Sequence, residues 1–239
     1  MKKIILLLLG LAFISIRTSP IENKIEEDWE SLFDGKTLDG WHQFSRKGVP
    51  SIKKFKDWRL TFDPGDSPKV DYIHDIVTDI SYKNFELSIN WNISEGGNSD
   101  IFWGVQEGDS FNKPYSTGPE IQVLEDERNP DALVNPKSHQ GGELYDPFQP
   151  TKDVFMPARE WNHVLLTIDH NKNQGSVRLN GAKIIESPLS GPKWNTLASN
   201  SKFNDDCDFK YFGKFTSGKI GLQDYGNKVS LRDIKISKV

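Results

Sequence analysis

The sequence predicts an all-β fold of antiparallel strands, and three observations support this prediction. Apolar and polar residues alternate with a period of two in several segments, as in strands with one buried face. Glycine, proline and asparagine separate these segments at short intervals, as turns between strands do. No segment of about 12 residues has the 3.6-residue periodicity of an amphipathic helix. The 239 residues therefore suit one sandwich or barrel of short strands.

The expected strands run along most of the chain. The clearest is residues 85–93, where every second residue is apolar. Asn180-Gly181 predicts a hairpin, because this dipeptide is the commonest two-residue turn. Two denser apolar segments indicate strands buried on both faces. Strands are expected within residues 85–93, 101–105, 121–124, 164–168, 177–186 and 229–236.

Other segments predict little regular structure. Residues 26–33 and 131–134 could each form one short helical turn. Residues 107–117 are rich in glycine, aspartate, asparagine and proline, and we expect a long loop there. Residues 187–217 contain prolines, asparagines and an acidic cluster, which indicates a second long loop. Loops of this length in a compact domain are usually functional or mobile.

The N-terminus has the pattern of a secretory signal. A basic start precedes an apolar run over residues 4–16, and a polar segment follows over residues 17–20. The apolar run is too short to span a bilayer. We expect cleavage within residues 15–20, with an uncleaved N-terminal anchor as the alternative. The prediction is a signal peptide over 1–19 and a single domain over 20–239, exported to the periplasm or the cell exterior without a membrane span.

Charge and cysteine content exclude several classes of protein. The net charge is −4, and it becomes −7 without the three cations of the signal segment, which argues against a nucleic-acid partner. An aromatic content of 11% argues against a disordered chain. The single cysteine excludes a disulfide scaffold and a multi-cysteine metal site. Cys207 lies between two aspartates, whose charges would raise the thiol pKa and weaken it as a nucleophile.

The most informative segment for chemistry is residues 118–126. On a strand, Glu120 and Gln122 point to one face, and the apolar residues between them point to the core. A carboxylate and a carboxamide on one sheet face can hold sugar hydroxyls, and the carboxylate can also transfer a proton. A solvent-facing glutamate on an open sheet is the simpler alternative.

Two further candidates precede this segment. Asn98 follows a Gly-Gly turn at the mouth of a strand, where its side chain could bind substrate hydroxyls or cap the turn. Trp103 could offer its ring as a stacking platform for a sugar, although most tryptophans in a sandwich belong to the core.

The segment from His139 to Asp146 combines an imidazole, a phenol and two carboxylates around a Gly-Gly turn. His139 is a proton-transfer candidate, because histidine titrates near neutral pH. The sequence has no paired-histidine zinc motif, nucleotide-binding loop or nucleophile elbow. A metal held by His139 and distant carboxylates stays an open alternative that no spacing demands.

Several motifs together resemble the 3-keto-disaccharide hydrolase family, whose domain is abundant in exported proteins of Bacteroidetes. The resemblance begins at Ser31 to Trp41, which reads SLFDGKTLDGW. It covers about residues 28–239, and its strength lies in the order of the motifs. The further matches are Phe85 to Leu87, Gly96 to Ser99, Glu120 to Leu124, Gly142 to Tyr145, Glu160 to Asn162, Leu179 to Gly181, Gly218 to Gln223 and Leu231 to Ile234.

The resemblance implies a concanavalin A-like jelly-roll sandwich of two curved antiparallel sheets, with the site on a concave face. It implies glycosides oxidised at C3 as substrates, cleaved by proton abstraction, elimination and hydration. Glu120 would be a base or ligand, and His139 a second proton-transfer group or metal ligand. The family relation fixes no cofactor, and a divalent cation stays an option. The residues expected to line the cleft are Asn98, Gln122, Asp126 and Tyr145.

This chain departs from the family pattern at two positions. By the resemblance, Asp100 stands where the family usually has glycine, and Trp103 stands where it usually has a cationic arginine. Loss of that cation would weaken stabilisation of an enolate unless a metal or Arg128 replaces it. The departures imply altered specificity or binding without catalysis.

Two alternatives remain from the sequence. The same strand resembles more weakly that of family-sixteen glucanases, with Glu120 and Glu125 as the two carboxylates and Gln122 in place of an assisting aspartate. A retaining glycosidase needs its two carboxyl groups about 5–5.5 Å apart. Glu125 could meet that distance only if a bulge turned it inward. The other alternative is a non-catalytic carbohydrate-binding module.

Overall fold

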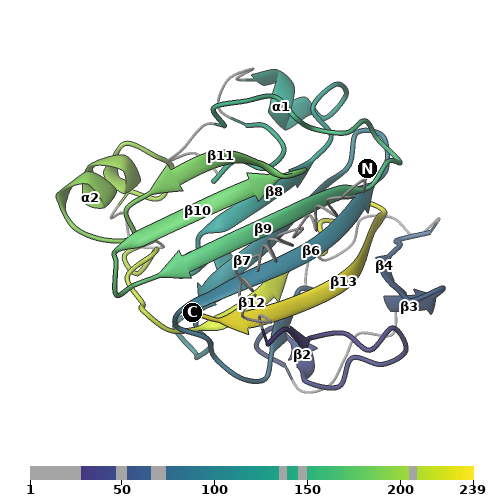
Figure 1. Cartoon of the computed structure of the whole chain (residues 1–239), viewed down its shortest axis with the longest axis horizontal. Coiled ribbons are helices and arrows are strands. Elements are labelled where there is room, and N and C mark those ends of the chain that lie inside the picture. Colours follow the sequence, from purple (N-terminus) through teal and green to yellow (C-terminus); the bar gives the residue numbers. More distant parts are fainter. Residues whose placement is uncertain (1–27, 47–52, 66–73, 135–138, 145–149, 205–208) are drawn as a thin grey trace, which may run out of the picture.

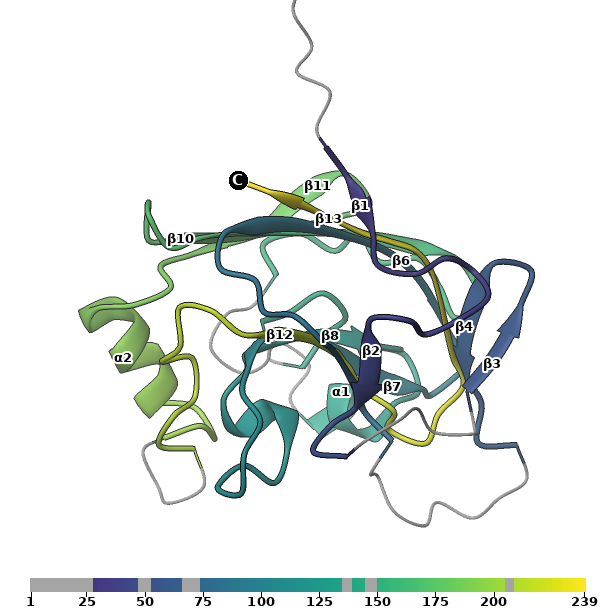
Figure 2. The ribbon, with the colours of Figure 1, turned by 90° about the horizontal axis from the view of Figure 1, so that it is seen from below.

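The computed structural model describes residues 28–46, 53–65, 74–134, 139–144, 150–204 and 209–239. Two antiparallel sheets stack as the layers of a sandwich, which confirms the predicted all-β jelly-roll fold (Figures 1 and 2). The expected signal peptide, Cys207 and Tyr145 lie outside the described residues. No helix in the described ranges is long and apolar enough to cross a membrane.

The larger sheet has eight strands and forms the upper layer in Figure 2. Its hydrogen-bonded strands follow the order β11-β10-β9-β6-β13-β4-β3, and β1 pairs separately with β13. The strands are β1 (Glu30–Ser31), β3 (Lys53–Lys56), β4 (Arg59–Phe62), β6 (Phe85–Ile93), β9 (Asn162–Asp169), β10 (Gln174–Leu179), β11 (Ala182–Ser187) and β13 (Val229–Lys238).

The smaller sheet has five strands in the order β2-β5-β12-β7-β8. Its last two strands are buried along their entire length, as the dense apolar runs predicted. Residues 98–100, expected at the mouth of the strand, already belong to β7. The strands are β2 (Trp41–Gln43), β5 (Ile76–Thr78), β7 (Asn98–Val105), β8 (Glu120–Leu124) and β12 (Lys219–Leu222).

The core fills the space between the two sheets. The alternating residues of β6, from Phe85 to Ile93, face inward and meet the inward residues of β7 and β8 in one hydrophobic cluster. The predicted hairpin joins β10 to β11, and Asn180 and Gly181 have the positive φ angles of 50° and 83° that its two-residue turn requires.

The connections contain more helix than the sequence predicted. Short helix α1 (Pro130–Val134) confirms the turn expected at 131–134, whereas the turn expected at 26–33 is wrong because residues 30–31 form strand β1. The loop expected at 107–117 contains the 3-10 turn η1 (Pro114–Ser116). Residues 187–217 contain helix α2 (Pro192–Ser199), stabilised by stacking of buried Trp194 on Phe212. Figure 2 shows α2 at one end of the sandwich, beside the smaller sheet.

Candidate active site

The face of the smaller sheet that points away from the core carries the candidate site. Ile121 and Val123 of β8 join the central core, so Glu120 and Gln122 point to the opposite face. The same alternation in β7 places Asp100 on that outer face. Asp100 lies directly opposite Gln122 in the pairing of β7 with β8. The prediction that Glu120 and Gln122 share one sheet face is consistent with this arrangement.

Buried polar residues form a row across this face. The backbone N–H of Gln223 donates to the carbonyl of Asp100 at 2.9 Å, which places Gln223 beside Asp100. On the other side, the N–H of Gln122 donates to the carbonyl of Glu143, and Gly142 donates back to Gln122. Gly142 has a φ of 84°, as expected of the first residue of a β-bulge. The Gly-Gly turn noted in the sequence therefore extends the polar row beyond β8.

Four side-chain oxygens near this row are buried and have no hydrogen-bond partner among the described residues. They are Oδ1 of Asn98, Oδ1 of Asp100, Oε1 of Gln122 and Oε1 of Gln223. A buried polar atom without a partner costs free energy, so native proteins rarely leave one unpaired without a role. Acceptor oxygens gathered on one face suit a ligand with many hydroxyl donors. They would also suit a hard cation, but the described residues contain no cluster of three histidine, cysteine or carboxylate side chains arranged for a metal.

Glu120 has the electrostatics of a proton-transfer group. Its side chain is buried, and Oε1 lies 3.7 Å from Nζ of Lys202. Burial raises the pKa of Glu120 to about 7, because desolvation outweighs the opposing effect of the Lys202 ammonium. The charges of Asp131 and Asp75 raise this pKa further. Glu120 can therefore gain or lose a proton near neutral pH, where general bases and acids work best.

Asp100 is the second perturbed carboxyl on this face. Burial is the largest cause that raises its pKa well above the usual range, and the charge of Glu120 is the next. Lys202 acts in the opposite direction. The raised pKa of Asp100 favours its protonated form while Glu120 is ionised, so the two carboxyls are suited to opposite roles.

Lys202 is a candidate site residue that sequence reasoning missed. It follows helix α2 and packs its ammonium 4.8 Å from the ring centroid of Phe203 and 5.9 Å from that of Tyr115. The pKa of Tyr115 is raised by its own burial and by the charge of Glu120. Nothing in the spacing of the sequence indicated that residues 187–217 return to β8. The one available signal was a lysine beside an aromatic residue in a loop too long to be a simple connection.

The other predicted residues divide into two groups. Asn98 lies on the site's strand, and its Oδ1 is one of the four oxygens described above. Trp103 points to the opposite side, where it is only 5% exposed and belongs to the core cluster. A ring in the core cannot stack on a sugar, so the expected role of Trp103 as a platform is wrong. Because Trp103 points to the core, this position supplies no cation to the polar face in place of the family's arginine.

His139 and Asp126 border the site. Nδ1 of His139 lies 3.1 Å from Oδ1 of Asp131, the aspartate of α1 whose charge raises the pKa of Glu120. Oδ1 of Asp126 accepts the backbone N–H of Gly141 at 2.8 Å, and burial raises the pKa of Asp126 to about 6. Asp126 thus anchors the segment that carries His139.

Glu125 does not act as a second carboxylate of the site. Its Oε2 accepts the backbone N–H of Gly96 at 2.7 Å and of Arg128 at 3.1 Å, and its Oε1 accepts the N–H of Glu127. The Arg128 guanidinium donates to the same carboxylate. Both residues therefore fix a loop, and Arg128 is not the cation that replaces a missing arginine.

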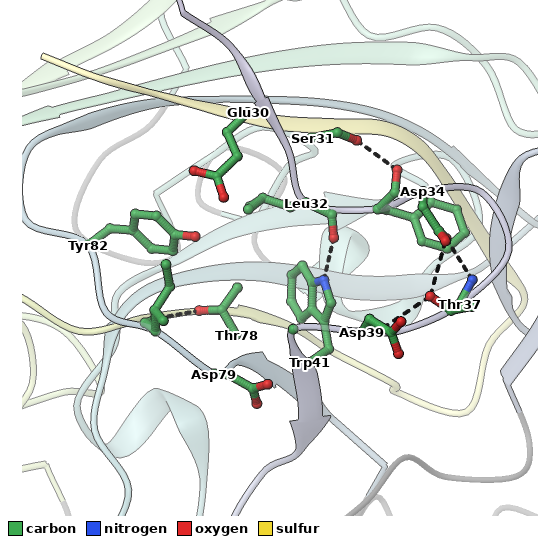
Figure 3. Close-up of a pocket in the computed structure, with 13 residues that line it drawn as sticks. Glu30, Ser31, Leu32, Asp34, Thr37, Asp39, Trp41, Thr78, Asp79 and Tyr82 are labelled. Atoms are coloured by element: carbon green, nitrogen blue, oxygen red, sulfur yellow. Dashed lines mark hydrogen bonds between the residues drawn. The ribbon is translucent and has the colours of Figure 1, made fainter.

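The N-terminal motif builds a different feature, shown in Figure 3. Oδ1 of Asp34 accepts the backbone N–H groups of Lys36 and Thr37, and the Trp41 indole donates to the carbonyl of Leu32. These bonds shape a turn beside a pocket of about 210 Å³. Buried Tyr82 lines this pocket, and burial, assisted by the charge of Glu30, raises its pKa to about 12. The pocket contains none of the residues around Glu120.

Comparisons with known proteins show the family of this chain. The family described as the 3-keto-alpha-glucoside-1,2-lyase-like domain matches residues 28–237. A 3-keto-disaccharide hydrolase of Bacteroides thetaiotaomicron is 32% identical over 235 residues, which cover 86% of this chain and 77% of that protein.

Solved structures of similar proteins support the same relationship. A protein of Parabacteroides distasonis, provisionally named a glycosyl hydrolase, superposes with a TM-score of 0.77 at 27% identity, covering 88% of this chain and 94% of its own. A second such protein of that organism, 23% identical, shares the fold with a TM-score of 0.64 over 88% of this chain and 99% of its own. The chain therefore belongs to the family of 3-keto-alpha-glucoside-1,2-lyase-like domains and is a carbohydrate-active enzyme.

Proposed function

We propose that this protein cleaves 3-keto-glycosides by elimination across C1 and C2 of the oxidised sugar, followed by addition of water. The observation that carries the proposal is Glu120, a buried carboxyl with a pKa of about 7 beside an ammonium and a second carboxyl whose pKa burial also raises. The similar 3-keto-disaccharide hydrolase supports the choice of substrate class.

The first step uses the acidity that a C3 ketone gives to the neighbouring C2 hydrogen. The Glu120 carboxylate takes that proton, and the electrons of the C2–H bond move onto the ketone oxygen to form an enolate. The ammonium of Lys202, held beside Glu120, stabilises the new negative charge. Lys202 thus supplies the cation that the sequence had led us to expect from an arginine.

The second step expels the leaving group. The enolate electrons return to form the C1–C2 double bond, the C1–O bond breaks, and protonated Asp100 gives its proton to the departing oxygen. The Asp100 carboxylate then takes a proton from a water molecule as the oxygen of that water adds at C1, and the Glu120 carboxyl returns a proton to C2. The sum of these steps is hydrolysis, and both carboxyls end in their starting states.

Substrate hydroxyls would satisfy the unpartnered oxygens of the polar row. Gln122, Gln223 and Asn98 each present a buried acceptor on or beside the strands that carry the two carboxyls. His139, paired with Asp131, stands at the border as a second proton-transfer candidate or a metal ligand. The N-terminal apolar run of residues 4–16 supports export of the protein.

The alternative of a retaining glycosidase is less well supported. That mechanism needs a second carboxylate free to attack or assist, and the carboxylate of Glu125 is engaged by three backbone N–H groups and a guanidinium. A pure binding module would not need a carboxyl poised near neutral pH.

A paired assay tests the proposal. Purified protein is given p-nitrophenyl glucoside and its 3-keto derivative, each with and without EDTA. We expect p-nitrophenol release from the keto substrate alone, and Glu120→Gln should lose that turnover while retaining binding. Release from the plain glucoside would contradict the proposal in favour of a conventional glycosidase. Sensitivity to EDTA would assign a metal to the site.

A further inference from the structure

The tip of the β3–β4 hairpin carries an aromatic residue in an unfavourable conformation. Lys56 pairs with Arg59, so the turn between the strands consists of Asp57 and Trp58 alone. Both have positive φ angles, 52° and 62°. Two-residue turns of this kind favour Asn-Gly or Asp-Gly, because a bulky side chain is strained in the left-handed region. A tryptophan therefore occupies a backbone conformation that favours glycine.

Among the described residues, Trp58 is also the most exposed large hydrophobic side chain, at 65%. Its ring nevertheless has a fixed position, because it rests against Gly35 of the neighbouring turn. A Cβ atom added to Gly35 would lie 2.1 Å from Cε3 of Trp58, so only glycine allows this contact. The Lys36 ammonium lies 5.3 Å from the ring centroid. One part of the ring is therefore held by the protein, and the rest is presented to solvent.

The hairpin is basic in an acidic protein. Residues 53–59 contain four cations and one aspartate, whereas the whole chain has a net charge of −4. Arg59 pairs with Asp57 at 3.0 Å, and exposed Lys56 lies beside the turn. The Lys36 ammonium lies over the exposed ring, and Lys56 and Arg59 flank the two turn residues in the sequence. The charge favours an anionic ligand.

We propose that Trp58 is a binding platform for an anionic polysaccharide, with a sugar ring stacked on the indole and its carboxylate or sulfate groups paired with Lys36 and Lys56. A flat apolar ring fits the C–H face of a pyranose, and an oriented ring avoids the entropy cost of ordering a mobile one. The platform holds the glycan outside the site that contains Glu120 and does not depend on the elimination mechanism.

Other occupants fit the surface less well. A stable protein interface buries about 800 Å² on each partner, and the described exposed apolar side chains of the hairpin are only Trp58 and Phe55. Pairing of a second copy along edge strand β3 is opposed by its lysines, which block edge-to-edge association.

Figures 1 and 2 show β3 and β4 at the end of the sandwich opposite α2, the helix that leads into Lys202. The hairpin is therefore separate from the part of the site that contains Lys202.

Affinity electrophoresis tests the proposal with the full chain. Polygalacturonate and chondroitin sulfate are the anionic probes, neutral dextran is the control polymer, and single-stranded DNA tests for general polyanion binding. We expect retardation by at least one anionic glycan, weakened by added salt. Trp58→Gly should reduce the affinity about tenfold or more and keep the fold, because Asp-Gly suits this turn. Lys56→Glu should reduce both the affinity and its dependence on salt.

A matched control removes exposed apolar surface elsewhere. Ile80, 55% exposed, lies outside the hairpin, and Ile80→Asn should bind like the parent. Turnover of a small 3-keto-glucoside should be the same in the parent and the hairpin variants. A failure of the glycan-binding proposal can therefore be distinguished from a failure of the proposed enzymatic activity. Equal binding by Trp58→Gly and the parent would overturn the proposal, as would equal retardation by dextran or by DNA.

Discussion

The ammonium of Lys202 lies 3.7 Å from Oε1 of Glu120, although one residue follows a helix and the other begins a buried strand. This pair determines how the site can work. The ammonium lowers the pKa of a carboxyl that burial would otherwise raise further, so that the carboxyl titrates near neutral pH. In the proposed mechanism, the same cation stabilises the enolate oxygen.

Removal of the cation should affect both the rate and its pH dependence. We expect Lys202→Met to lower kcat/KM on a 3-keto substrate by about 10²–10³-fold. Because Glu120 loses the group that lowers its pKa, the rising limb of the pH–rate profile should move to higher pH. Lys202→Arg should restore part of the rate. A lower rate with an unmoved limb would show that Lys202 acts through structure alone.

The buried charge of Glu120 should cost stability in a pH-dependent way. The pKa of Glu120 rises from 4.5 to about 7 on folding, so its favourable contribution is present below pH 4.5 and is lost as pH rises through 7. Glu120→Gln should therefore stabilise the protein at pH 8, by about 3 kcal/mol at most, and have little effect at pH 4. Thermal unfolding at both pH values measures this, with exposed Glu160→Gln as the control. An equal effect at both pH values would contradict the raised pKa.

The role of Asp100 depends on the leaving group. We expect Asp100→Asn to lose about 10²–10⁴-fold in rate with a 3-keto-disaccharide, whose sugar alkoxide needs a proton to depart. The loss should be much smaller with the p-nitrophenyl substrate, because p-nitrophenolate leaves without protonation. Equal losses on both substrates would exclude Asp100 as the acid.

Glu125 should be structural. Because Glu125→Gln removes a buried charge that accepts several N–H bonds, we expect a loss of about 1–3 kcal/mol in the free energy of unfolding. Glu127, whose side chain is 70% exposed, provides the control Glu127→Gln with little effect. A folded Glu125→Gln protein should still turn over 3-keto substrate. Loss of turnover without loss of stability would revive the retaining mechanism.

The sequence predicted the strands well because their alternation reflects burial directly. It also predicted the shared face of Glu120 and Gln122, because side chains two residues apart on a strand point to the same face whatever strands lie beside it. The prediction that Trp103 is a stacking platform was wrong because the strand around it is apolar on both faces. Alternation therefore does not show which face of that strand meets the core. Lys202 and the pairing of Asp100 with Gln122 depend on long-range contacts that no local pattern encodes.

The most direct test follows the hydrogen at C2 of the oxidised sugar. A 3-keto-glucoside deuterated at C2 is cleaved in ordinary water, and its rate and product are compared with those of the unlabelled substrate. Proton abstraction by Glu120 predicts slower cleavage of the labelled substrate, and a product that has lost deuterium from C2 to the extent that the Glu120 carboxyl exchanges with water before it returns a proton. Equal rates with deuterium retained at C2 would show that the C1–O bond breaks without elimination, and would contradict the proposed mechanism.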